Sequence, residues 1–160
     1  MQQTSPTPTT RYDWESMLTE SDYATMLFIQ ELMHKGEYQA AKEGIDQLVD
    51  FETRVEKREM KQALVRLMTA VILWKEDETY RTSEQVHEIA EARDEVDFYK
   101  EEGTELNNGF LEEVWDEAFV RASKYVSIEL QQETTIRELT WDAVFTEEYS
   151  MFTNKSGYDG

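Results

Sequence analysis

The arrangement best suited to chemistry is a glutamate followed three residues later by a histidine, which occurs twice and includes both histidines of the chain. The pairs are Glu31 with His34 and Glu84 with His87. Residues three apart share one face of a helix, and carboxylate-bridged two-metal bundles use two such pairs plus a glutamate from each of two further helices. One alternative is therefore a metal-binding or redox bundle, with further carboxylates from Glu59 and from Glu113 or Glu117.

The surroundings of these pairs favour an ordinary surface over a metal site. Glutamate is so frequent in this chain that the spacing arises easily by chance. Each pair stands near the end of its expected helix, whereas two-metal sites lie inside a bundle, and the first pair is on the first main helix rather than the second. We therefore expect no bound metal or cofactor, and we keep these four residues only as candidates.

A row of acids is the second notable pattern, and it consists of Glu84, Glu88, Glu91 and Glu95. The row lies opposite Ile89 and Val96 on the expected helix, so a solvated face relieved by Arg81 and Arg93 is the simpler interpretation. Like charges four apart in a helix cost a few tenths of a kcal/mol, so the row also predicts an interaction face for a basic partner. Such a partner could be a nuclease or a DNA-binding protein whose DNA this face imitates.

Composition narrows the classes of partner. The chain has 160 residues with 35 acids, 16 bases, a net charge of −19 and no cysteine. This charge repels nucleic acid and anionic membrane, and the lack of cysteine fits a reducing compartment, so we expect a cytoplasmic protein. The first ten residues show no secretory pattern, and the longest apolar-dominated run, Ala63 to Trp74, includes Arg66 and is shorter than the roughly 20 residues of a membrane span.

Motifs for catalysis are missing from the sequence. It contains no glycine-rich phosphate loop and no G-x-S-x-G elbow. Glu113 and Glu117 share a helical row, but a general acid needs a burial that a sequence does not show. Aromatic residues are abundant, yet a base-stacking platform would interleave them with lysine or arginine. We therefore expect the protein not to be an enzyme.

The elements that position all these residues are helices organised around Glu56 to Lys75. Its inward stripe repeats at spacings of three and four and consists of Met60, Leu64, Leu67, Val71 and Trp74. By residue 70 the helix is apolar nearly all round, which is typical of a central buried helix. A preceding helix from about Gln39 to Phe51 faces inward with Ala41, Ile45 and Leu48, and the sequence leaves open whether it joins the central helix.

Capping residues predict the remaining helices. Tyr12 to Leu18 forms a turn or two. Thr19 caps a helix from about 20 to 35 that carries the row Tyr23, Leu27, Gln30 and His34 and stops at Gly36. Thr82 with Gln85 opens a helix to about Lys100, ended by Gly103. Two more helices run from about Leu106 to Gln131 and from Trp141 to Phe145, the latter capped by Thr140.

These elements predict an all-α bundle of five to six helices that forms one domain over residues 12–152. The terminal segments, 1–11 and 153–160, are expected to be a disordered tail and a frayed tail.

The order of several segments carries a family resemblance. They are Asp22-Tyr23, the end at Leu32 to Gly36, the run Leu67 to Lys75, the stretch Gln85 to Arg93, the run Phe110 to Ala122, and Thr140-Trp141 to Tyr149. In this layout the chain resembles domain-of-unknown-function family 29, a mostly cyanobacterial family. The resemblance implies an all-helical fold and no established activity or site residue. Where members commonly carry a histidine in the leucine-rich run, this chain has Ala70.

The leading functional hypothesis is a non-enzymatic protein–protein interaction module with a protein partner, basic if it meets the acid row. Binding to nucleic acid or to a membrane is not expected, and the oligomeric state is open.

Overall fold

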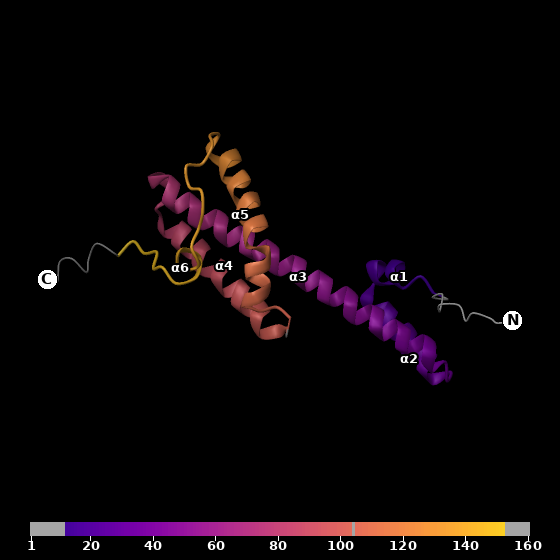
Figure 1. Ribbon diagram of the computed structural model, residues 1–160. Coiled ribbons are helices and arrows are strands. Elements are labelled where there is room, and N and C mark those ends of the chain that lie inside the picture. Colours follow the sequence, from indigo (N-terminus) through magenta and orange to yellow (C-terminus); the bar gives the residue numbers. More distant parts are fainter. Residues whose placement is uncertain (1–11, 104, 153–160) are drawn as a thin grey trace. The chain divides into compact units, whose positions relative to one another are not determined.

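The structure is a computed structural model, and it describes residues 12–103 and 105–152 (Figure 1). The described residues form six α-helices and one short 3₁₀-helix, with no strand among them, which confirms the predicted all-α class. None of these helices is both long and apolar enough to cross a membrane. The tails expected at 1–11 and 153–160 lie outside the described residues.

The chain divides into two compact units, Met1–Val55 and Glu56–Gly160. Helix α3, Tyr38–Glu76, runs for 39 residues without interruption. Its residues up to Val55 belong to the first unit, and those from Glu56 belong to the second. The question that the sequence left open is thereby answered, because the helices expected at 39–51 and 56–75 are one helix. The single domain over 12–152 stays a prediction.

The first unit begins with α1, Trp14–Glu20, and α2, Asp22–His34. The expected N-cap at Thr19 is wrong: Ser21 caps α2 and accepts a hydrogen bond from the amide of Ala24 at 3.0 Å. Thr19 lies inside α1, where its hydroxyl donates to the carbonyl of Glu15. The expected stop after Lys35 is confirmed, because Gly36 adopts φ +79°, a left-handed conformation that glycine tolerates best.

The core of this unit is small and consists of Trp14, Ile29, Leu32 and Ala41. Gly44 is required by this core, since a Cβ atom there would stand 2.6 Å from Cη2 of Trp14 and 2.8 Å from Cγ1 of Ile29. The expectation that Ile45 faces inward is wrong, because that side chain is 43% exposed. The helix instead turns its smallest residues towards the tryptophan.

The second unit is built around the remaining part of α3, whose predicted burial is confirmed. Met60, Leu64, Leu67 and Val71 are all fully buried, and Trp74 packs against the same core. Helix α4, Ser83–Glu102, and helix α5, Asn108–Leu130, supply the other faces. Burial on nearly all sides is what the apolar circumference of this segment predicts.

Local capping sets the bounds of these helices. The 3₁₀-helix η1, Glu78–Tyr80, links α3 to α4. The Oγ1 atom of Thr82 accepts from the amide of Gln85 at 3.1 Å, and Gly103 ends α4, as predicted. The side chain of Gln85 does not complete the capping box, because its Nε2 donates to the carbonyl of Ala70 on α3 at 2.9 Å.

Helix α6, Trp141–Phe145, has the predicted bounds and the predicted cap at Thr140. Arg93 of α4 holds this segment to the unit, since its guanidinium donates to the carbonyls of Val144 and Glu147, both at 2.8 Å. Burial lowers the pKa of Arg93 from its usual value. The connection is therefore made through backbone acceptors rather than through an ion pair.

Candidate functional site

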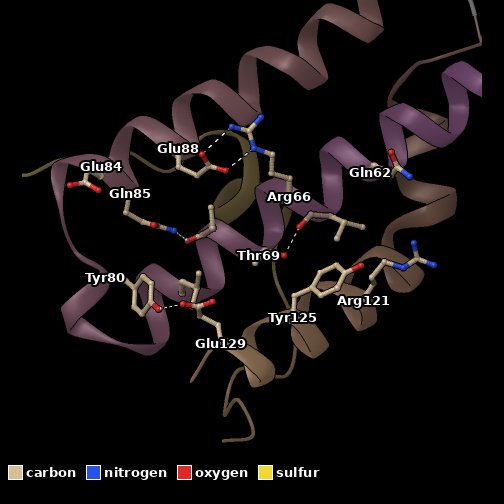
Figure 2. A pocket seen from close by; sticks show the side chains of 13 residues that line it. Gln62, Arg66, Thr69, Tyr80, Glu84, Gln85, Glu88, Arg121, Tyr125 and Glu129 are labelled. Atoms are coloured by element: carbon tan, nitrogen blue, oxygen red, sulfur yellow. Dashed lines mark hydrogen bonds and ion pairs between the residues drawn. The ribbon is translucent and has the colours of Figure 1, made fainter. Parts of the chain in front are cut away.

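An open groove of about 690 Å³ lies in the second unit, between side chains of α3, α4 and α5 (Figure 2). Its lining consists of Gln62, Val65, Arg66, Thr69, Ala70, Leu73, Tyr80, Glu84, Gln85, Glu88, Arg121, Tyr125 and Glu129. This volume falls within the range of about 300–1,000 Å³ that is usual for binding sites.

Helix α3 supplies an apolar floor. Val65, Ala70 and Leu73 are buried in the unit yet line the groove. The hydroxyl of Thr69 donates to the carbonyl of Val65 at 2.7 Å, so its proton is engaged within the helix. At about 1.5 Å per residue, the floor from residue 62 to 73 is roughly 16 Å long, or three helical turns.

Glutamates of α4 form the acidic wall, and Arg66 of α3 pairs with three of them. Its guanidinium makes a two-bond contact with Glu88, at 2.6 and 3.0 Å, and reaches Glu91 at 3.3 Å and Glu95 at 3.1 Å. Figure 2 shows Arg66 and Glu88 facing each other from α3 and α4. The hydrogen bonds that Arg66 donates to Glu88 lower the pKa of Glu88 and raise the pKa of Arg66.

The predicted acid row is thus largely engaged inside the unit. Three of its four members pair with Arg66, and Glu84 has no ion pair within the described part of the chain. The predicted relief of the row by Arg81 and Arg93 is wrong, because both donate to backbone carbonyls elsewhere. Their proximity to the row in sequence was misleading, because Arg81 precedes α4 and Arg93 lies on a different face of α4.

The wall on α5 has a different character. Tyr125 is 48% exposed, and Arg121 is exposed beside it (Figure 2). Among the described residues neither makes a hydrogen bond or an ion pair. The pKa of Glu117 is lowered chiefly by Lys61, and the charge of Arg121 contributes to this lowering. At one end of the groove, the hydroxyl of Tyr80 donates to Glu129 at 2.7 Å, and this bond raises the pKa of Tyr80.

The two Glu-x-x-His pairs belong to different units. His34 stands in the last turn of α2, and Glu31 pairs with Lys35 at 3.4 Å. His87 is well exposed on α4 and its Nε2 lies 3.0 Å from Glu91, not beside Glu84. Within the described ranges, no group of three or more histidine, aspartate or glutamate side chains is arranged to hold a metal ion. The metal alternative stays a prediction, which analysis of the purified protein for iron and manganese would test.

The further carboxylates considered for such a site have other surroundings. Glu59 accepts a hydrogen bond from the hydroxyl of Tyr99 at 3.4 Å, and Glu117 pairs with Lys61 at 2.7 Å. Glu113 is exposed on α5. None of the three lines the groove.

Sequence reasoning missed the residues that give the groove its character, Arg66, Arg121 and Tyr125. A signal was present for Arg66, because a lone arginine inside an apolar run needs acidic partners when it is partly buried. No comparable signal marks Arg121. Tyr125 belongs by spacing to the apolar row of Ala118 and Ala122, which predicts that it faces inward; this prediction is wrong, because Tyr125 is 48% exposed.

The fold and groove define an all-helical protein with an apolar-floored surface cleft. The model of the family described as Domain of unknown function DUF29 matches residues 33–151, and the chain belongs to this family. This confirms the resemblance drawn from the order of segments. No curated protein and no solved structure matches the chain.

Proposed function

We propose that the protein is a non-enzymatic protein–protein interaction module whose groove among α3, α4 and α5 receives an amphipathic helix of a partner protein. The observation that carries the proposal is an apolar floor placed between an acidic wall and a wall with an exposed arginine. A helix docks in such grooves through apolar side chains at i, i+3 or i+4, and i+7, which need about two to three turns. The floor offers roughly that length.

The charges beside the floor specify the orientation of the partner helix. Glu84 lies exposed on the α4 side without an ion pair among the described residues, whereas Arg121 lies exposed on the α5 side. A basic residue of the partner would meet Glu84, and an acidic residue would meet Arg121. The basic partner predicted from the acid row is retained, but its contact moves to Glu84, since the other three acids already pair with Arg66.

The ionisable groups of the groove also favour binding over catalysis. Glu88 is held ionised by Arg66, and Glu129 is engaged by the hydroxyl of Tyr80. A general acid or base needs a proton that it can release or accept near neutral pH, and a carboxyl with a lowered pKa is poorly suited to that role. The proposal includes a cytoplasmic location, which the lack of cysteine supports.

The test compares what the full chain and its variants capture from an extract of the native cell, with quantification by mass spectrometry. Glu84→Lys reverses one charge at the acidic wall, and Tyr125→Ala removes the aromatic side chain of the other wall. We expect at least one protein to be captured by the wild type and reduced about tenfold or more by each variant. Its capture should also weaken as salt is raised, because exposed charges are screened.

Two matched variants keep this test specific. Glu101→Lys makes the same charge change on α4 outside the groove lining, and Ile128→Ala removes an exposed apolar side chain from α5 outside it. Both should capture the partner as the wild type does. A set of captured proteins that the two groove variants leave unchanged, or that all four variants change alike, would contradict the proposal.

A further inference from the structure

Among the described residues of the first unit, seven large apolar or aromatic side chains are exposed, and six of these, all except Leu27, lie on one side of α2 and α3. Their exposed fractions lie between 43% for Ile45 and 65% for Tyr23. We call the set the hairpin face, and it consists of Tyr23, Met26 and Met33 of α2 and Tyr38, Ile45 and Val49 of α3.

Helix α2 and the start of α3 form an antiparallel hairpin. The tight link at Gly36 joins them, and Ile29 and Leu32 of α2 pack in one cluster with Ala41 of α3, while Gly44 lies against Ile29. On this register Met33 lies near the level of Tyr38, Met26 near Ile45, and Tyr23 near Val49. The six residues therefore form three successive levels, each with one side chain from each helix.

Both halves of the hairpin face point away from α1. Successive helical residues are about 100° apart, so Met26 and Met33 lie to one side of the buried Ile29, while Phe28, which packs on Trp14 of α1, lies to the other. On α3, the three face residues lie about 100–140° to one side of Gly44. Arg54, which pairs with Glu15 of α1 at 3.3 Å, lies to the other side. Among the described residues of this unit, helix α1 thus covers one side of the hairpin, and no segment covers the opposite side.

The uncovered side is poor in charge in a chain whose net charge is −19. Helix α2 has only two acids, Asp22 in its first turn and Glu31, which pairs with Lys35. Beside the α3 half of the face, Lys42 pairs with Asp46 at 2.9 Å. Depletion of charge together with methionine and tyrosine is the composition of an interface core.

We propose that the hairpin face is a homodimer interface that a second copy of this chain covers, hairpin against hairpin. Six such side chains at about half exposure leave on the order of 600 Å², most of the roughly 800 Å² that each partner contributes to a standard interface. Two hairpins facing across a two-fold axis make a four-helix arrangement in which every face residue meets the same surface. The inference does not rest on the groove, because all six residues belong to the first unit.

Charge identifies the occupant as a second copy. Two chains of charge −19 repel each other wherever acids meet acids, and this surface lets them approach with little such repulsion. Acids flank the hairpin face at one end only, where Asp22 stands one turn before Met26 and Glu52 one turn after Val49, so a partner chosen for basic charge would meet few of them. Burial of the face would also add apolar contacts to a unit whose main buried cluster has four members among the described residues.

The test is the mass of the full chain in solution, measured by sedimentation equilibrium over a range of concentrations. The wild type is expected at twice the chain mass of 18.9 kDa. Val49→Glu, which puts an acid at an already exposed position on both copies, should raise the dissociation constant at least tenfold. Val120→Glu makes the same change at an exposed position of α5 and should leave the dimer unchanged.

A second measurement identifies the face directly. The chain has no cysteine, so a single Met26→Cys or Ile45→Cys change supplies one thiol per copy. At least one of the two should give a disulfide-linked dimer under mild oxidation faster than Val120→Cys does. A wild type that stays monomeric at all concentrations would overturn the proposal. A dimer equally resistant to Val49→Glu and to Val120→Glu would overturn it as well, because its interface would then lie elsewhere.

Discussion

Replacing Arg66 by methionine removes the one cation that faces three glutamates of α4. Methionine keeps an unbranched apolar side chain that can follow the packing of the arginine stem, so the change isolates the charge and its hydrogen bonds. The pairs lost are the two-bond contact with Glu88 and the contacts with Glu91 and Glu95.

The expected loss of unfolding free energy is about 1–2 kcal/mol. An exposed ion pair contributes only about 0.2–1 kcal/mol, and these side chains are 38–53% exposed, so solvent screens them. Two factors make the expected loss of unfolding free energy larger than that of a single exposed ion pair. The contact with Glu88 has two hydrogen bonds, and the variant leaves acids at i, i+4 that repel by a few tenths of a kcal/mol.

The loss should depend on pH in a defined direction. The pKa of Glu88 is lowered in the folded protein by its hydrogen bonds with Arg66. Such a carboxyl stabilises the fold above its unfolded pKa, about 4.3, and this contribution disappears as the pH falls through the lower folded pKa. The difference in unfolding free energy between the wild type and Arg66→Met should therefore be largest near neutral pH and decrease below about pH 4.

Urea denaturation followed by circular dichroism measures both quantities. Arg58→Met is the matched control, because Arg58 is exposed on the same helix and has no ion pair among the described residues. That control should change stability by less than about 0.5 kcal/mol. The reasoning is refuted if Arg66→Met costs no more than the control, or if its cost stays constant or grows as the pH falls.

Three further outcomes are expected from the same denaturation assay. Leu67→Ala and Ile72→Ala, at fully buried positions, should each cost about 2–5 kcal/mol, and losses below about 0.5 would place that part of α3 at the surface. Gly44→Ala should cost about 1–3 kcal/mol by forcing Trp14 aside, although alanine is about 1 kcal/mol more favourable than glycine in an isolated helix. A stabilised variant would contradict the close approach of Trp14 to residue 44. Arg93→Met should cost about 1–3 kcal/mol and speed hydrogen exchange at residues 141–149, whereas unchanged exchange there would show that Arg93 does not hold α6.

Periodicity and capping predicted most of the fold. The stripe of the central helix, the cap at Thr82 and the bounds of α6 follow from local rules, because each depends on residues within a few positions. The predicted cap at Thr19 was wrong, and the reason is also local. Ser21 competes two residues later, and a short helix before it takes Thr19 into its own last turn.

The site needed information that no local pattern contains. Arg66 and Glu88 are 22 positions apart, and their contact depends on how α4 packs beside α3. The exposure of Ile45 has a similar origin, because Trp14 occupies the inward side of α3 and selects Ala41 and Gly44 for it. A hydrophobic row predicts that a helix has an apolar face, but not which of two apolar faces the chain itself covers.

The central helix and the two proposed binding surfaces have separate roles. Within the second unit, α3 buries leucine, methionine, valine and isoleucine, and its partly buried arginine is engaged by glutamates. The two surfaces proposed for partners are the groove, whose apolar floor comes from α3, and the hairpin face. These two surfaces share no residue and belong to different units, so Glu84→Lys should leave the dimer intact. By the same reasoning, Val49→Glu should leave a single groove competent to bind, and the two proposals can fail independently.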